Sequence, residues 1–286
     1  MKIIPIRQIS SAHQELSAER FKIRQVQDIL DGSDLKQELH RHNFFFMLVL
    51  QNGSGMHEID FTSYPLVNNC IFFLRPGQVH QLELKAGCTG FLLEFNTAFY
   101  HPKNNLSIQR LRKASNKNYC TPGISSFEKL YAILMYIFQE YADKAEGYLD
   151  VIKANMDIFF IEVTRQSPHV TSQPANTNSY AQERLEEFVE LVEINIATHK
   201  QVAQYSDLMN LSPYQLNEIT RSTVGKTASA LINDHIILEA KRYLLATPNL
   251  IKEIADQLGY EDTSYFTRFF RKQTGYSPEI FRHNSV

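Results

Sequence analysis

The chain has 286 residues and carries 29 Lys and Arg against 31 Asp and Glu, a net charge of −2. This length predicts two domains, each large enough to bury a core. The three cysteines form no CxxC pair, which argues against a disulfide framework or a zinc ribbon. No apolar run approaches the ~18–20 residues of a membrane span, and no secretory pattern is visible. We therefore expect a cytoplasmic protein that has no contact with a membrane.

The first half of the chain has the pattern of a β-barrel. From residue 38 to residue 50 the sequence has strand periodicity, and both faces are apolar after Asn43. Shorter strand-like segments follow at residues 57–61, 69–74, 78–84 and 90–95. Many short strands at about ten-residue spacing predict a barrel or jelly roll.

Several histidines lie within these strand-like segments. His40 and His42 form an HxH pair, and His80 ends a PGxxH segment. Together with the glycines of the turn at residues 51–55, this pattern resembles the cupin barrel, and the resemblance implies a sensor domain over residues 1–124. In metal-binding cupins, two histidines and a glutamate on one strand and a later histidine bind the metal. The glutamate position falls at Phe46 here, so that ligand is missing.

Three imidazoles can hold zinc or iron, but such histidines more commonly cap strand ends or line a ligand pocket. Because the carboxylate is missing and the segment is rich in phenylalanine, we expect a barrel without metal or cofactor that takes a small organic effector. The aromatic wall of its pocket is expected from Phe44, Phe46, Phe72 and Phe91. The effector contacts that we expect are His40, His42, Phe44, Phe46, Phe72 and His80.

Residues 125–165 have the apolar spacing of two amphipathic helices, which we expect to pack on the barrel. Residues 166–182 contain no Lys, Arg, Asp or Glu and are rich in Ser, Thr, Asn, Gln and Pro, which is typical of a linker. We expect the last domain to occupy residues 183–286.

Residues 251–282 have the pattern of a helix-turn-helix. Helical spacing ends before Gly259, and Asp262 or Thr263 can cap a second helix with an apolar inner face and an arginine-bearing outer face. Arginine and short hydroxyls suit a DNA major groove, although two packed helices with a solvated charged face would look similar. The same design occurs about 49 residues upstream, in residues 202–221, where Ser212-Pro213 starts the second helix.

Residues 183–282 resemble the DNA-binding domain of the AraC/XylS family of transcription regulators. The matching positions include Leu211-Ser212-Pro213, Glu253-Ile254-Ala255, Leu258-Gly259-Tyr260, Ser264-Tyr265-Phe266, Phe270-Arg271-Lys272 and Ser277-Pro278. The resemblance implies two helix-turn-helix units on a linking helix, with two recognition helices in successive major grooves. It also implies that residues 125–165 serve dimerisation. Two departures are Glu218, where the family usually has a basic or small polar residue, and Thr220, where it usually has Phe.

The expected fold is therefore α+β with two domains: a cupin-like β-barrel with following helices, then an all-α double helix-turn-helix. The DNA contacts that we expect are Tyr214, Gln215, Asn217, Glu218, Arg221, Thr263, Ser264, Thr267, Arg268, Arg271 and Lys272. Residues 183–286 carry 11 Lys and Arg against 14 Asp and Glu, which is unusual for a DNA-binding domain. We expect the cations to gather on the second recognition helix and the acidic helix at the start of the domain to face away from DNA.

The predicted function is that of a ligand-responsive, homodimeric transcription regulator without catalysis. Activation, and with it contact to RNA polymerase, is the commoner behaviour that the resemblance implies. One alternative is a cupin metalloprotein or metalloenzyme with a helical appendage, which bound metal would reveal. Another is a regulator whose sensor domain binds no small molecule.

Overall fold

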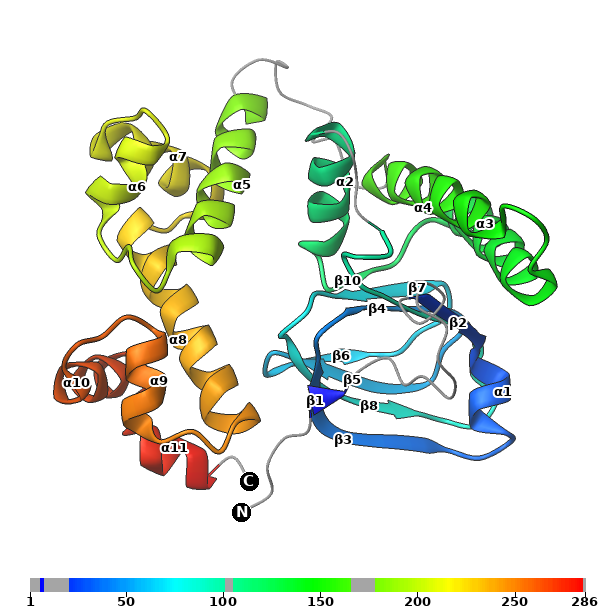
Figure 1. The fold of residues 1–286 in the computed structure, drawn as a ribbon, viewed down its shortest axis with the longest axis horizontal. Coiled ribbons are helices and arrows are strands. Elements are labelled where there is room, and N and C mark those ends of the chain that lie inside the picture. The colour runs from blue at the N-terminus through cyan, green and yellow to red at the C-terminus, as the bar shows by residue number, and fades with distance from the viewer. Residues whose placement is uncertain (1–5, 8–20, 101–104, 166–177, 285–286) are drawn as a thin grey trace. The chain divides into compact units, whose positions relative to one another are not determined.

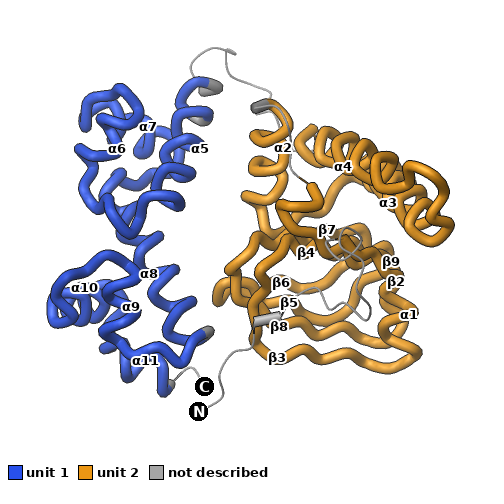
Figure 2. Tube along the Cα trace, viewed as in Figure 1, with its two compact units in different colours: residues 1–3, 170–286 blue, residues 4–169 orange. Residues whose placement is uncertain are grey.

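The computed structural model describes residues 6–7, 21–100, 105–165 and 178–284. The chain divides into two compact units (Figure 2). Residues 4–169, orange in the figure, are called the first unit, and residues 170–286 with residues 1–3, blue in the figure, are called the second unit. The strands lie in the first unit, and the second is built of helices (Figure 1). The expected linker, 166–182, lies outside the described residues up to residue 177. Helix α5 then begins at Asn178, where the guanidinium of Arg184 lies over the ring of Tyr180 one turn earlier.

Two sheets form the barrel of the first unit. Their strands are β1 (Ile6–Arg7), β2 (Phe21–Gln25), β3 (Leu35–His42), β4 (Phe45–Asn52), β5 (Gly55–Ile59), β6 (Thr62–Pro65), β7 (Cys70–Leu74), β8 (Val79–Leu84), β9 (Thr89–Phe95) and β10 (Tyr119–Cys120). Within the described residues, one sheet has the order β1-β3-β8-β5-β6 and the other β10-β7-β4-β9-β2. A short helix, α1 (Val26–Leu30), connects β2 to the loop before β3.

The continuous strand expected over residues 38–50 is in fact two strands in different sheets. The chain leaves the first sheet after His42 and enters the second at Phe45. The carbonyl of His42 accepts a hydrogen bond of 2.8 Å from the amide of Gly77 in the turn before β8. Strand periodicity continues through this corner, so the sequence does not mark it.

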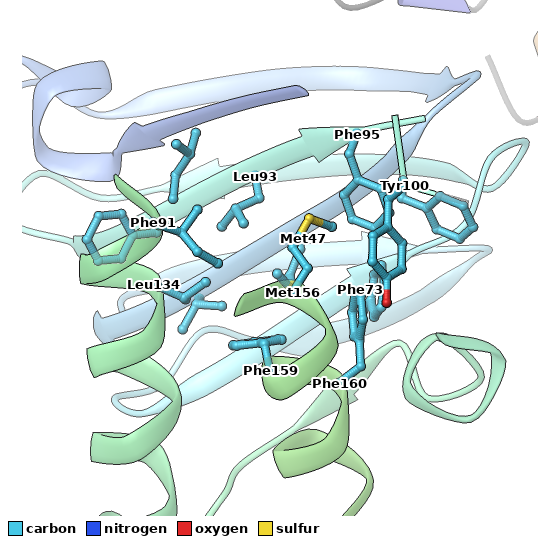
Figure 3. Packing of buried hydrophobic residues seen from close by; sticks show 14 of the residues in the cluster. Met47, Phe73, Phe91, Leu93, Phe95, Tyr100, Leu134, Met156, Phe159 and Phe160 are labelled. Atoms are coloured by element: carbon cyan, nitrogen blue, oxygen red, sulfur yellow. The ribbon is translucent and has the colours of Figure 1, made fainter. Parts of the chain in front are cut away.

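The second sheet is buried on both faces. Between the two sheets lie apolar side chains from both, among them Phe46, Leu48 and Leu82. On the outer face, alternate residues such as Met47 and Phe73 pack against the helical layer (Figure 3). The strand β4 contributes to both cores, which explains why its apolar residues do not alternate with polar ones.

Three helices complete this unit: α2 (Asn105–Ser115), α3 (Ile124–Asp143) and α4 (Tyr148–Arg165). The two amphipathic helices expected in residues 125–165 are confirmed as α3 and α4. They pack on each other and on the outer face of the second sheet, where Leu134 and Phe160 are fully buried.

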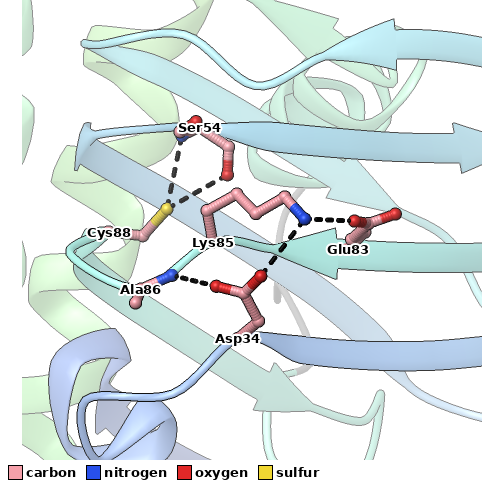
Figure 4. A network of polar contacts seen from close by, with 6 residues as sticks. All are labelled: Asp34, Ser54, Glu83, Lys85, Ala86 and Cys88. Carbon is pink, nitrogen blue, oxygen red and sulfur yellow. Dashed lines mark hydrogen bonds and ion pairs between the residues drawn. The ribbon is translucent and has the colours of Figure 1, made fainter.

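Polar side chains tie together the turns at one end of the barrel (Figure 4). Lys85 forms ion pairs with Asp34 at 3.2 Å and with Glu83 at 2.6 Å. The amide of Ala86 and the ammonium of Lys85 donate to Asp34 and hold the pKa of its carboxyl below the ordinary value. The Cys88 thiol donates to the carbonyl of Ser54, on the neighbouring hairpin.

The second unit repeats one helix-turn-helix design. Its helices are α5 (Asn178–Asn195), α6 (Val202–Leu208), α7 (Pro213–Val224), α8 (Ala228–Ala246), α9 (Ile251–Gln257), α10 (Thr263–Thr274) and α11 (Pro278–Asn284). The pairs α6–α7 and α9–α10 are the two helix-turn-helix units, and α8 is the linking helix between them (Figure 1). One core, with Phe188, Ile236 and Phe266 among its buried residues, joins all of these helices except the last, whose Phe281 packs at its edge.

The two turns share their hydrogen bonds. Asn210 and Gly259 hold corresponding places with φ of 53° and 72°, in the left-handed region. After Asn210, the amide of Leu211 bonds to the carbonyl of Ser206; after Gly259, the amide of Tyr260 bonds to that of Ala255. Each turn thus reverses the chain in the same way, which confirms the repeat.

The second turn needs glycine for a further reason. A Cβ at Gly259 would lie 1.6 Å from the carbonyl oxygen of Ala197, which follows α5. The backbone of Ala197 cannot move aside as a flexible side chain can. The segment after α5 can therefore pack this closely against the turn only if residue 259 has no side chain. By contrast, Gly225 after α7 has almost the same φ, 71°, with nothing within 4 Å of such a Cβ.

These two glycines give a matched prediction. We expect Gly225→Ala to cost about 1–2 kcal/mol, the strain of a left-handed residue with a side chain. Gly259→Ala should cost about 1–3 kcal/mol more, because it also overpacks the contact with Ala197. Urea denaturation of the isolated second unit measures both. Equal losses from the two variants would show that the close approach of α5 is not required.

Candidate DNA-binding surface and effector site

Each candidate recognition helix has a well-defined start and end. The Ser212 hydroxyl accepts from the amide of Gln215 at the start of α7, and Asp262 accepts from the amide of Ser264 at the start of α10. Glycines in the left-handed conformation end both helices. These caps satisfy backbone groups that a helix end otherwise leaves without partners, so both helices have fixed lengths and faces.

The helix α10 has one buried face and one polar face. Phe266 and Phe270 are fully buried in the core of the unit. The expected DNA contacts on the other side are exposed or half-buried, in the order Thr263, Ser264, Thr267, Arg268, Arg271 and Lys272. The three cations form no ion pair with another described residue, so their charges are available to a ligand.

On the helix α7, only three of the five expected DNA contacts lack a structural role described below. Tyr214 is 74% exposed, and Glu218 and Arg221 follow it along the same side at intervals of about one turn. The other two expected contacts have structural partners. Gln215 accepts from the amide of Ser212 in the capping box, and Asn217 accepts from the amide of Ala228 at 3.1 Å. Their side chains therefore hold the ends of α7 and α8.

Several cations away from the candidate surface have partners. Lys226 pairs with Asp234 at 2.7 Å, and Arg282 donates to the carbonyls of Leu244 and Asn249. Within the described part of the chain, Arg221 on α7 has no ion pair, like the cations of α10. Most of the positive charge without an ion pair to a described residue therefore lies on α7 and α10, with Lys252 of α9 as a further exposed cation, although the unit as a whole is acidic.

A second candidate site lies between the sheets of the first unit. His40 and His42 are two residues apart in β3 and point to the same side, and His80 is paired with His40 across the β3–β8 ladder. The Nε2 atoms of His42 and His80 are 2.7 Å apart. The Nδ1 of His40 donates to the carbonyl of Glu38 at 2.7 Å. All three rings are buried.

A fourth histidine, His57, belongs to the same cluster and is not among the effector contacts expected from the sequence. Its Nε2 is 2.9 Å from Nδ1 of His80. Burial and, as a smaller contribution, the nearby His40 lower the pKa of His57 to about 3, so the ring is neutral at physiological pH. The available signal was its position two residues before Ile59 in a strand, which places both on the interior face.

The aromatic residues expected around these histidines do lie there, with one exception. Phe44 and Phe46 lie 4.3 and 5.3 Å from His42 between ring centroids, and Phe72 lies 4.8 Å from His57. Phe91 was placed wrongly. It lies on the outer face of β9 against α3, because that sheet is apolar on both sides and the pattern does not distinguish them.

Two family models match the chain in separate places. The AraC-like ligand binding domain matches residues 31–102, which contain the histidine cluster. A helix-turn-helix domain matches residues 205–284, which contain both α7 and α10.

Curated relatives match most of the chain. The transcriptional regulator YfiF of Bacillus subtilis is 23% identical over 253 residues, which are 85% of this chain and 78% of that protein. The transcriptional activator RhaS of Escherichia coli is 22% identical over 246 residues, which are 85% of this chain and 86% of that protein.

Among solved structures, ToxT of Vibrio cholerae with a bound unsaturated fatty acid is 17% identical, with a TM-score of 0.43 over 94% of this chain and 97% of that one. None of the described helices is long and apolar enough to cross a membrane. With an AraC-like ligand-binding domain, a double helix-turn-helix and regulators as relatives along its length, this protein belongs to the AraC/XylS family of transcription regulators.

Proposed function

We propose that this regulator binds double-stranded DNA through α7 and α10 and that a small effector in the barrel changes this binding. The observation that carries the proposal is the group of unpaired cations on the outer face of α10. The proposal includes homodimerisation, activation through RNA polymerase and a cytoplasmic location, and it includes no catalysis. The activator RhaS, which matches most of this chain, supports activation.

We assign most of the sequence readout to α10. Arg268 lies in the middle of its exposed face, one turn after Ser264, where a guanidinium can bond to O6 and N7 of guanine. Arg271 and Lys272 lie a turn later and suit phosphates, which position the protein without reading sequence. At the position of α7 that corresponds to Arg268 stands Glu218, whose carboxylate repels phosphates.

We assign effector binding to the interior of the barrel, at His40, His42, Phe44, Phe46, Phe72 and His80. Rings from both sheets meet there, so a ligand at this point would touch both. The outer face of the same second sheet carries α3 and α4. A conformational change inside the barrel would therefore reach α3 and α4 through this one sheet.

We assign dimerisation to the exposed face of α3. Ala132 and Met135 line two grooves, of about 530 and 480 Å³. Met135 and Tyr136 are both 47% exposed there. An exposed, grooved helix face of this kind can pack against a second copy of itself about a two-fold axis.

Because the proposal gives DNA binding to the second unit alone, it predicts that residues 183–286 fold and bind DNA without the rest of the chain. The reason is that the described residues of this part have one core of their own. Circular dichroism tests folding, and titration with the protein's own promoter region at several salt concentrations tests binding. A folded fragment without salt-dependent binding would contradict the proposal.

Three substitutions distinguish side chains that read the base sequence from side chains that only position the protein on the phosphates. Arg268→Ala should cost about 1–3 kcal/mol of binding free energy and relax the preference at one base pair. Lys272→Ala should weaken binding to all sequences about equally and flatten the salt slope by about one unit. Glu218→Ala should be neutral or tighten non-specific binding.

Competition binding against single-base operator variants, at several salt concentrations, measures all three. If Arg268→Ala keeps every base preference while Glu218→Ala loses one, α7 is the principal reader and the assignment is reversed.

The dimer surface has a matched pair of variants. Met135→Arg should convert the dimer into a monomer, because it places a charge in the proposed contact. Ile158→Arg on α4, at a residue that is 48% exposed but lines neither groove, should leave the dimer intact. Light scattering after size exclusion measures the mass. A dimer that survives Met135→Arg would place the interface elsewhere.

A further inference from the structure

The interior of the barrel is closely filled at the histidine cluster. The six residues assigned above to the effector are at most 5% exposed. The rings of five of them contact one another, and the sixth, Phe72, contacts His57. An organic molecule of ordinary size would have to displace several of these rings. A single ion among the imidazole nitrogens would displace none of the aromatic rings.

Three imidazoles already converge there. One ring nitrogen of each of His40, His42 and His80 lies within 4.8 Å of the corresponding nitrogens of the other two. Zinc binds histidine at about 2.0–2.1 Å, so two tetrahedral ligands are about 3.3 Å apart. The 2.7 Å between His42 and His80 would therefore widen by about half an ångström when an ion entered.

The other nitrogens of two rings are held in the way that metal-binding histidines require. Since the carbonyl of Glu38 can only accept, Nδ1 of His40 carries the proton and its Nε2 carries the lone pair. His57 stands in the same relation to His80: it can accept the Nδ1 proton, which puts the lone pair of His80 on Nε2. That nitrogen faces Nε2 of His42 at 2.7 Å, and an ion would enter between the two. Such partners fix ring orientation and tautomer in metal sites.

We propose that His40, His42 and His80 bind one divalent transition-metal ion of the zinc class, with His57 as the positioning residue for His80. Neutral imidazoles suit this class of ion rather than magnesium or calcium, which take oxygen ligands. Three protein ligands leave a coordination position open, as in zinc sites that also bind a small molecule.

This inference departs from the expectation of a metal-free barrel, which depended on the missing glutamate at Phe46. His57 supplies a hydrogen-bond partner for the ligand His80, and the sequence pattern did not include this partner. The inference rests on the proposed sensor function, because it names the class of ligand that the same site takes.

The test uses the full-length chain, freed of metal with a chelator and then titrated with Zn²⁺ by calorimetry and with Co²⁺ by visible absorption. We expect one ion per chain and a Co²⁺ spectrum of nitrogen ligands. His42→Ala and His80→Ala should abolish this binding. His283→Ala, at an exposed histidine of the second unit, should leave it unchanged.

His57 has its own pair of variants. His57→Leu should weaken the affinity about 10–100-fold, the usual effect of losing the hydrogen-bond partner of a ligand. His57→Gln keeps an acceptor and should restore much of it. A His57→Leu chain that binds as tightly as the wild type would overturn the role of His57.

Two results overturn the metal site itself: a wild-type chain that takes up no stoichiometric ion, and binding that survives His42→Ala. The Co²⁺ spectrum of the wild-type chain decides the matter even if a variant fails to fold. A chain that binds its promoter but no ion would overturn this inference alone. A chain that binds the ion but no DNA would support the site and contradict the proposed function.

Discussion

The burial of β4 on both faces is the constraint on which the first unit depends. Every residue from Phe45 to Leu50 is buried, with alternate side chains in the barrel interior and in the helical layer. Because interiors are close-packed, neither core can change volume at this strand without disturbing the other. The histidines and α3 are therefore separated by a single layer of backbone, which is the route that the proposed sensor would use to act on its helices.

Local rules predicted much of the second unit from the sequence. Ser212 was expected as one cap and Asp262 or Thr263 as the other, because such side chains satisfy helix ends; Ser212 and Asp262 accept the backbone bonds. The spacing of about 49 residues between the two halves revealed the repeat, and the turns at Asn210 and Gly259 share their hydrogen bonds. These features are encoded within a few residues, so periodicity and capping are sufficient to find them.

Features set by tertiary contacts were harder to predict. Phe91 was assigned to the barrel interior, since alternation cannot tell the two faces of a doubly buried strand apart. His57 was overlooked because its partner His80 lies on another strand, and only the register of β5 on β8 brings the two together. Asn217 is expected to contact DNA, and the structure adds a bond from the amide of Ala228 that depends on the start of the next helix. In each case a partner distant in sequence decides what the side chain does.

The pairing of cations away from α7 and α10 has a consequence for how the protein would search a genome. Chromosomal DNA offers about 10⁶–10⁹ competing sites, and a uniformly basic domain would spend its time bound to them. Here residues 183–286 carry more acidic than basic side chains, and most of the cations without an ion pair lie on α7 and α10. If these helices bind DNA, encounters in other orientations should be weaker and shorter, and fewer molecules would be sequestered on bulk DNA. A cell could then saturate a single operator with a small number of copies of the protein.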